Sequence, residues 1–272
     1  MNASRAAKFK TKSLIIIFLS ISGLCFAQAS PEELLKQVAA NWKKNRIDSP
    51  TFTYEVLHKV FDKNPWGANA PPKVTKYDVL VIEGLPYMRA MEVNGKPLSP
   101  ADAAEEQSKY EKAVEDRRHL TPEQRAVAYD VNLKMPIEWL PELFNVKFSS
   151  KKDKDPNIVV LDCEPRALRP GNDDEREVLA HSYRLWIDKN DMMPTKMESK
   201  VINDNAFMKG GRVERNSTST YKWVKIGHSW VIASSESSYR IWFSHDSSAQ
   251  GSIEETYSKY KEFHATATVI PK

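Results

Sequence analysis

The stretch that decides the fold is Val213–Phe243, VERNSTSTYKWVKIGHSWVIASSESSYRIWF. It contains two candidate long strands, at 213–226 and 229–243. Gly227 and His228 between them form the two-residue joint of a hairpin. Apolar and polar residues alternate along both segments, and both faces are partly polar. This pattern favours antiparallel pairing, because strands of a buried parallel sheet show nearly continuous apolar runs.

Further strand candidates lie on both sides of this hairpin, each with period-2 alternation or a short apolar run. They are residues 51–61, two strands within 74–93 that break near Gly84, 145–148, 157–163, 182–187, 195–201 and 252–263. Asn94-Gly95 is a strong turn signal. Residues 169–177 (RPGNDDERE) are expected to form a charged loop.

Helical segments precede and interrupt the strands. Residues 31–46 predict an amphipathic helix that begins at the N-cap Ser30. Residues 99–145 predict a helical insertion, which begins at a second N-cap, Ser99. Its end, 136–144 (PIEWLPELF), packs five large apolar residues into nine positions, and its prolines break it into short turns. This end is expected either to be ordinary core or to form an apolar lid over a cavity.

The first 27 residues have the pattern of an export signal. Four basic residues precede an uncharged run at 14–27, and small residues follow it. This run of 14 residues is too short to span a bilayer, which takes about 20. We therefore expect cleavage after Ala27, release into the periplasm and no transmembrane segment. A retained anchor is the alternative. Cys25 also leaves a lipid-modified N-terminus open, although Leu24 departs from the small residue expected before such a cysteine.

Without this segment the charges balance. The chain of 272 residues has 40 basic and 36 acidic residues, and removing the four basic residues of the signal leaves 36 of each. A near-neutral chain lacks the basic face of nucleic-acid-binding proteins, so no nucleic-acid partner is expected. Residues 28–272 are predicted to form a single domain. Cys163 would be its only cysteine, which excludes an intrachain disulfide and favours a buried thiol.

No pattern indicates catalysis or metal binding. The chain has no CxxC pair, and no two of its histidines are two to four residues apart: His58, His119, His181, His228, His245 and His264. Ser234–Ser238 is rich in hydroxyls but has no base nearby, and we interpret it as a polar sheet face. No catalytic residue, metal or cofactor is therefore expected. A pocket that brings Cys163 or a histidine against a carboxylate would favour an enzyme instead.

Aromatic residues and methionines are the remaining functional candidates. A single curved sheet has an inner face, which helices fill completely or leave partly open as an apolar cleft for a lipid tail. Methionine on that face would suit a variable ligand. The residues predicted to line such a cavity are Tyr54, Tyr87, Met91, Ile137, Trp139, Leu140, Leu143, Phe144, Leu185, Met197, Tyr221, Trp223 and Trp242.

The order of signal, helix, strands, capped helical insertion and long antiparallel meander resembles the periplasmic lipoprotein-carrier superfamily (LolA/LolB-like). It is most similar to the bacterial outer-membrane lipoprotein-sorting-like proteins. The segments that carry the resemblance are 93–99 (VNGKPLS), 183–188 (YRLWID) and 257–263 (YSKYKEF). This chain departs from the small carriers in its length and its larger insertion, and no cargo-contact residue can be carried over.

The resemblance implies an α+β fold with a curved antiparallel β-sheet, an unclosed half-barrel. An N-terminal helix and the insertion at 99–145 would cover its concave face. It also implies a monomeric periplasmic binding protein that holds lipid or lipoprotein acyl chains in an apolar hollow. An envelope sensor or assembly factor that binds a protein partner is the alternative, and a hydrolase is a third hypothesis.

Overall fold

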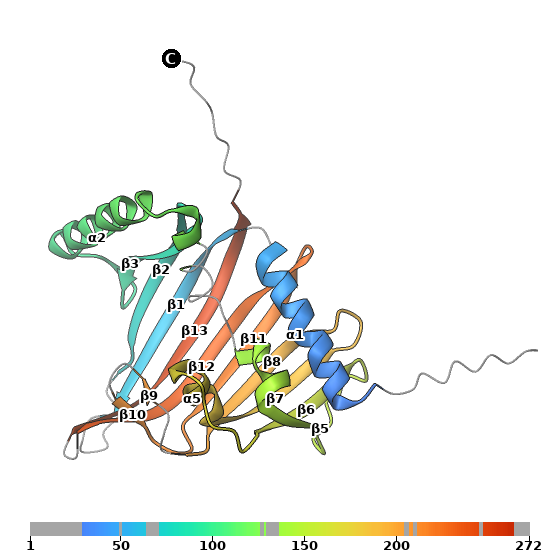
Figure 1. Ribbon diagram of the computed structural model, residues 1–272. Helices are drawn as coiled ribbons and strands as arrows, with labels where there is room; N and C mark the ends of the chain where they lie inside the picture. Colours follow the sequence, from blue (N-terminus) through green and yellow to red (C-terminus); the bar gives the residue numbers. More distant parts are fainter. Residues whose placement is uncertain are drawn as a thin grey trace, which may run out of the picture.

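The computed structural model describes residues 29–48, 51–63, 71–125, 128, 136–203, 207–208, 211–244 and 247–263. Most of them belong to one sheet of 13 strands, in which the order is β4-β3-β2-β1-β13-β12-β11-β8-β7-β6-β5 (Figure 1). The short β10 pairs with β12, and β9 pairs with β10. All its pairings are antiparallel. The described end strands β4 and β5 do not pair with each other, so the sheet is open. The predicted fold class is confirmed.

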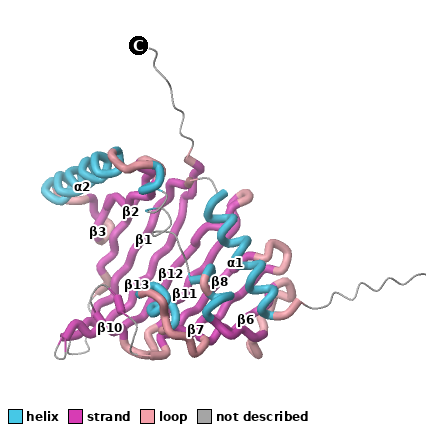
Figure 2. Tube along the Cα trace, viewed as in Figure 1, coloured by secondary structure: helices cyan, strands magenta, loops and turns pink. Residues whose placement is uncertain are grey.

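The elements have the following bounds. The strands are β1 (Phe52–Lys63), β2 (Lys73–Ile82), β3 (Leu85–Val93), β4 (Lys96–Pro97), β5 (Phe144–Phe148), β6 (Ile158–Pro165), β7 (His181–Asp188), β8 (Met193–Val201), β9 (Phe207–Met208), β10 (Gly211–Val213), β11 (Thr218–Ile226), β12 (Ser229–Ser244) and β13 (Ser247–Glu262). The helices are α1 (Pro31–Asp48), α2 (Pro100–Arg118), η1 (Pro136–Glu138), α4 (Leu140–Leu143) and α5 (Asp173–Leu179). Figure 2 shows the helices as separate pieces beside the continuous strands.

The strand register defines which side chains share a face. One cross-strand row runs through ten strands as Val93, Thr75, His58, Glu255, Ser235, Tyr221, Met197, Leu185, Leu161 and Phe148. The next row on the same face is Lys73, Val60, Ile253, Ser237, Ser219, Ser199, Tyr183, Cys163 and Val146. Directly opposed residues point to the same side of a sheet. We call the side that carries these rows the inner face.

Helix α1 covers the half of the inner face formed by β5 to β8 and β11 (Figure 1). A capping box begins this helix, because Ser30 and Glu33 exchange side-chain to backbone hydrogen bonds of 3.0 and 3.2 Å. Its apolar stripe, which includes the fully buried Leu35 and Val38, packs on the inner face together with η1 and α4. Arg46 also forms two hydrogen bonds with Glu138 of η1. The larger hydrophobic core therefore lies under one half of the sheet, and a smaller cluster is formed by Ala180, Val201, Val213 and Ile241.

The insertion divides into two parts with different roles. Its end, η1 and α4, covers the inner face beside α1, whereas α2 lies along the outer edge of β3 (Figure 1). There Glu106 accepts a hydrogen bond from the amide of Ala90, and Arg117 donates to the carbonyls of Leu85 and Pro86. Free amides and carbonyls of an edge strand are a template for pairing with another chain. Side chains of α2 form hydrogen bonds with the amide of Ala90 and the carbonyls of Leu85 and Pro86 on this edge.

Two predicted segments differ from the structure. Residues 169–177 were expected to form a loop, but α5 begins within them, because the Asn172 side chain accepts a hydrogen bond from the amide of Glu175 as an N-cap. The predicted strand 213–226 is interrupted between β10 and β11, where Asn216 has a φ of 74°. The predicted signal, its cleavage site and Cys25 lie outside the described residues. The alternatives of a retained anchor and of a lipid-modified N-terminus therefore also stay predictions.

Leu35→Ala tests whether the packing of α1 holds the fold together. Leu35 is fully buried, so its truncation should lower the free energy of unfolding by about 2–5 kcal/mol. Urea unfolding measures this change. Lys36→Ala is the matched control, because Lys36 is exposed and should change stability by less than about 0.5 kcal/mol. Equal effects of the two variants would contradict this account of the core.

Candidate functional site

The centre of the inner face carries a cluster of polar side chains around Glu255. Three groups bind its carboxylate: Nδ1 of His58 lies 2.9 Å from Oε1, and the hydroxyls of Ser235 and Tyr257 donate to Oε2 at 2.7 and 2.6 Å. Since an ionised carboxylate only accepts, Nδ1 of His58 carries the hydrogen. The side chains of Glu255 and His58 are 22% and 23% exposed, so the cluster remains in contact with solvent. We call these four residues the Glu255 cluster.

An aromatic cluster adjoins it on β1 and β13. It consists of Phe52, Tyr54, Tyr257 and Tyr260, all partly exposed. The rings of Tyr54 and Tyr260 are stacked with centroids 4.9 Å apart, and the ring of Tyr257 lies 6.0 Å from that of Tyr54. Tyr257 belongs to both clusters, because its hydroxyl binds Glu255 while its ring contacts Tyr54. Tyr257 is therefore the residue at which the polar part of the inner face meets its aromatic part.

The electrostatics of the cluster are dominated by one negative charge. Burial raises the pKa of Glu255, but the hydrogen bonds from Tyr257, Ser235 and His58 outweigh it, and the net pKa lies below its ordinary value. Burial, together with this charge, raises the pKa values of Tyr54 and Tyr257. Glu255 is therefore ionised and these phenols are protonated at neutral pH.

The cluster brings a histidine against a carboxylate, the arrangement that would favour an enzyme. Hydrolysis by a serine nucleophile requires the serine to bind the base, which in turn binds an orienting acid. Here Ser235 and His58 both bind Glu255, so the carboxylate separates nucleophile from base. Cys163 is fully buried, and burial raises the pKa of its thiol to about 12. This geometry does not support nucleophilic catalysis by either residue.

The residues predicted to line a cavity fall into two groups. Nine lie in or against the core under α1: Ile137, Trp139, Leu140, Leu143, Phe144, Leu185, Met197, Tyr221 and Trp223. Five of these nine have no exposed surface, so they fill the space under the helix. That any of them contacts a ligand remains a prediction.

The other four predicted residues are dispersed. Tyr54 belongs to the aromatic cluster. Tyr87 on β3 packs against Tyr110 of α2, with ring centroids 5.7 Å apart. Met91 on β3 is 38% exposed. Trp242 on β12 lies opposite Arg212 of β10.

Sequence reasoning missed the Glu255 cluster. The sequence predicts that His58 lies in a strand and Ser235 on a polar sheet face, but no motif in it indicates a site at Glu255. The two partners His58 and Glu255 are 197 residues apart, and only the pairing of β1 with β13 places them opposite each other. A usable signal is that Glu255 alternates with Ile253 and Tyr257, which puts an acid on an otherwise apolar strand face.

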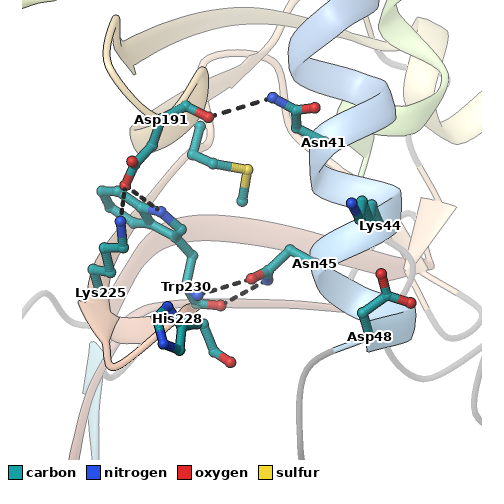
Figure 3. A pocket seen from close by; sticks show the side chains of 10 residues that line it. Asn41, Lys44, Asn45, Asp48, Asp191, Lys225, His228 and Trp230 are labelled. Atoms are coloured by element: carbon teal, nitrogen blue, oxygen red, sulfur yellow. Dashed lines mark hydrogen bonds and ion pairs between the residues drawn. The ribbon is translucent and has the colours of Figure 1, made fainter.

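A second candidate is a cavity of about 340 Å³ beside the C-terminal part of α1 (Figure 3). Its lining residues are Asn41, Lys44, Asn45, Asp48, Asp191, Met193, Lys225, His228, Ser229 and Trp230. Lys225 and the indole of Trp230 both donate to Asp191, and the bond from Lys225 is the main reason why the pKa of Asp191 is lowered. The charge of Asp191 in the cavity wall is therefore already bound by groups of the protein itself.

Two asparagines across this cavity attach α1 to the sheet (Figure 3). Asn41 donates to the carbonyls of Asp191 and Met192, each at 3.3 Å. Asn45 donates to the carbonyl of Trp230 at 2.9 Å and accepts from its amide at 2.8 Å. The cavity thus marks the joint between the helix and the β7–β8 and β11–β12 turns, and we do not assign it a ligand.

A further cavity of about 580 Å³ lies mainly on the outer face and is polar, and Arg184 and Asp162 form an ion pair in it. Among the described residues, no group of three histidine, cysteine or acidic side chains is placed to hold a metal ion. None of the described helices is long and apolar enough to cross a membrane.

Comparisons with known proteins leave the function open. No protein-family model and no curated protein matches the chain. Among solved structures, the chain is similar to a LolA superfamily protein from Nitrosomonas europaea, with 11% identity over 90% of this chain and 98% of that one, and a TM-score of 0.37. With so loose a superposition, the strand register and contacts of this chain remain the basis for its fold.

Asn45→Ala should weaken the attachment of α1. The loss of two hydrogen bonds to a partly buried backbone should lower stability by about 1–3 kcal/mol and speed hydrogen exchange of the Trp230 amide. Exchange detected by NMR or mass spectrometry measures the second effect. Lys44→Ala, at the adjacent exposed position, should leave exchange at Trp230 unchanged.

Glu255→Gln should destabilise the protein at neutral pH but not in acid. The folded-state pKa of Glu255 is lowered, so its ionisation stabilises the fold above the unfolded pKa of about 4.3. That stability is lost as pH falls through the folded pKa. Urea unfolding at pH 7 and at pH about 3 should show the difference between the two proteins shrinking in acid. A difference that is independent of pH would refute this role.

Proposed function

We propose that this protein is an exported binding protein that holds the acyl chain of a lipid or lipoprotein on the aromatic cluster of its inner face. The proposal includes cleavage after Ala27 and action in the periplasm by residues 28–272 as a single-domain monomer. It combines the secretion pattern of the first 27 residues with the chemistry of the inner face.

The observation that carries the proposal is the contrast in burial along the inner face. Under α1 the side chains of Leu185, Met197 and Phe144 are fully buried as part of the hydrophobic core. On β1 and β13 the rings of the aromatic cluster are only partly covered. A ligand of apolar surface gains roughly 25 cal/mol for each Å² that it buries. The aromatic cluster is therefore the part of this face where an acyl chain gains most.

The hydroxyl groups of the cluster support the same conclusion. Tyr257 donates to Glu255, and Tyr260 donates to the carbonyl of Ile232. Because these polar ends are bound within the protein, the rings present mainly carbon to a ligand. Burying them under a hydrocarbon chain then leaves no unpaired hydroxyl at these two positions.

Tyr54→Ala should weaken binding of a fluorescent fatty-acid probe about tenfold, which corresponds to ~1.4 kcal/mol of lost contact. Tyr54 lies between Tyr257 and Tyr260, so its removal opens the centre of the cluster. Titration of delipidated protein gives the affinity, and mass spectrometry of the native protein identifies lipids that co-purify.

Leu57→Ala is the matched control. Leu57 lies on the same strand but on the outer face, where it is 38% exposed, so its removal should leave probe binding unchanged. The proposal fails if the natural chain neither binds the probe nor co-purifies with lipid. Recovery of a protein partner without lipid would also count against it.

A further inference from the structure

Glu255 carries an incompletely neutralised charge in the middle of the inner face. Two cross-strand rows define the inner face, one from Val93 to Phe148 and one from Lys73 to Val146. Among the described residues of these rows, Glu255 is the only acidic one. Its ion-pair partner there is His58, whereas Ser235 and Tyr257 are neutral donors. Glu255 therefore supplies the negative charge of these two rows.

Tyrosine rings lie beside this charge. Tyr257 donates to Glu255 directly, and the ring of Tyr54 lies 6.0 Å from that of Tyr257. Tyr221 lies opposite Ser235, which also donates to Glu255. The face of an aromatic ring attracts cations, and a carboxylate beside several rings strengthens that attraction. Such a set of groups suits a ligand amine or quaternary ammonium.

We propose that the Glu255 cluster recognises the cationic amine head group of an amphiphile whose acyl chain lies on the aromatic cluster. This inference rests on the proposed function, because it names the head group for the same face. The two sites are continuous: the Tyr257 ring belongs to the aromatic cluster and its hydroxyl binds Glu255. A head group at Glu255 therefore directs an attached chain toward Tyr54 and Tyr260.

The test compares two ligands with the same chain, dodecyltrimethylammonium and dodecanoate, by calorimetric titration below their micelle concentrations. The ammonium ligand should bind at least about tenfold more tightly, as expected for a cation–π and charge contribution at a partly buried site. Equal binding, or tighter binding of dodecanoate, overturns the inference but leaves the proposed function standing. Binding of neither ligand overturns both.

A third titration distinguishes an amphiphile from a free amine. Tetramethylammonium has the same head group without a chain, and it should bind far more weakly than dodecyltrimethylammonium. Equal affinities would show that the cluster recognises the amine alone, which overturns the assignment to an amphiphile.

Glu255→Gln and Glu254→Gln form a matched pair of variants. Gln at 255 keeps the shape and removes the charge, so dodecyltrimethylammonium should bind about tenfold more weakly, while dodecanoate should not lose affinity. Glu254 is adjacent but lies on the outer face beside Lys59, and its change should affect neither ligand. An unchanged preference in Glu255→Gln overturns the inference. If that variant does not fold, the two-ligand comparison on the natural chain decides.

Discussion

The antiparallel register between β1 and β13 is the constraint on which the rest of this structure depends. It joins the first strand to the last, and it places His58 opposite Glu255 across 197 residues of chain. Through this pair the β2–β3 hairpin is continuous with the β11–β12 hairpin and with β5 to β8. Because side chains alternate along each strand, a shift of one residue in this pairing would move Glu255 to the outer face.

The inner face has two halves with different physical roles. Under α1, apolar side chains from five strands and four helical pieces are buried together, and this half contains the larger hydrophobic core of the fold. Across Tyr221 the same face becomes polar and then aromatic, and the rings of its aromatic cluster are only partly covered. A single row of residues thus runs from the core under α1 to the Glu255 cluster. The function that we propose uses the second half, where the aromatic rings remain partly exposed.

Local signals in the sequence predicted much of the secondary structure. The capping box at Ser30, the N-cap at Ser99 and the Gly227-His228 turn each act within a few residues, and each is present in the structure. The predictions were wrong in two segments where one local signal favours a different structure from another. Asn172 caps a helix in a segment so charged that it was interpreted as a loop, and Asn216 interrupts a stretch whose composition favours a strand.

The sequence by itself determined the antiparallel sheet, the amphipathic helix α1 and the burial of Cys163, because these follow from the period of the apolar residues and from residue type. It also supplied the aromatic residues as candidates. Only the tertiary structure decided which strand faces are inner, that α1 covers half of that side, and that Glu255 meets His58, Ser235 and Tyr257. Alternation shows which residues of one strand share a face. Which residues of other strands lie beside them depends on long-range strand pairing, and a local sequence pattern does not reveal that pairing.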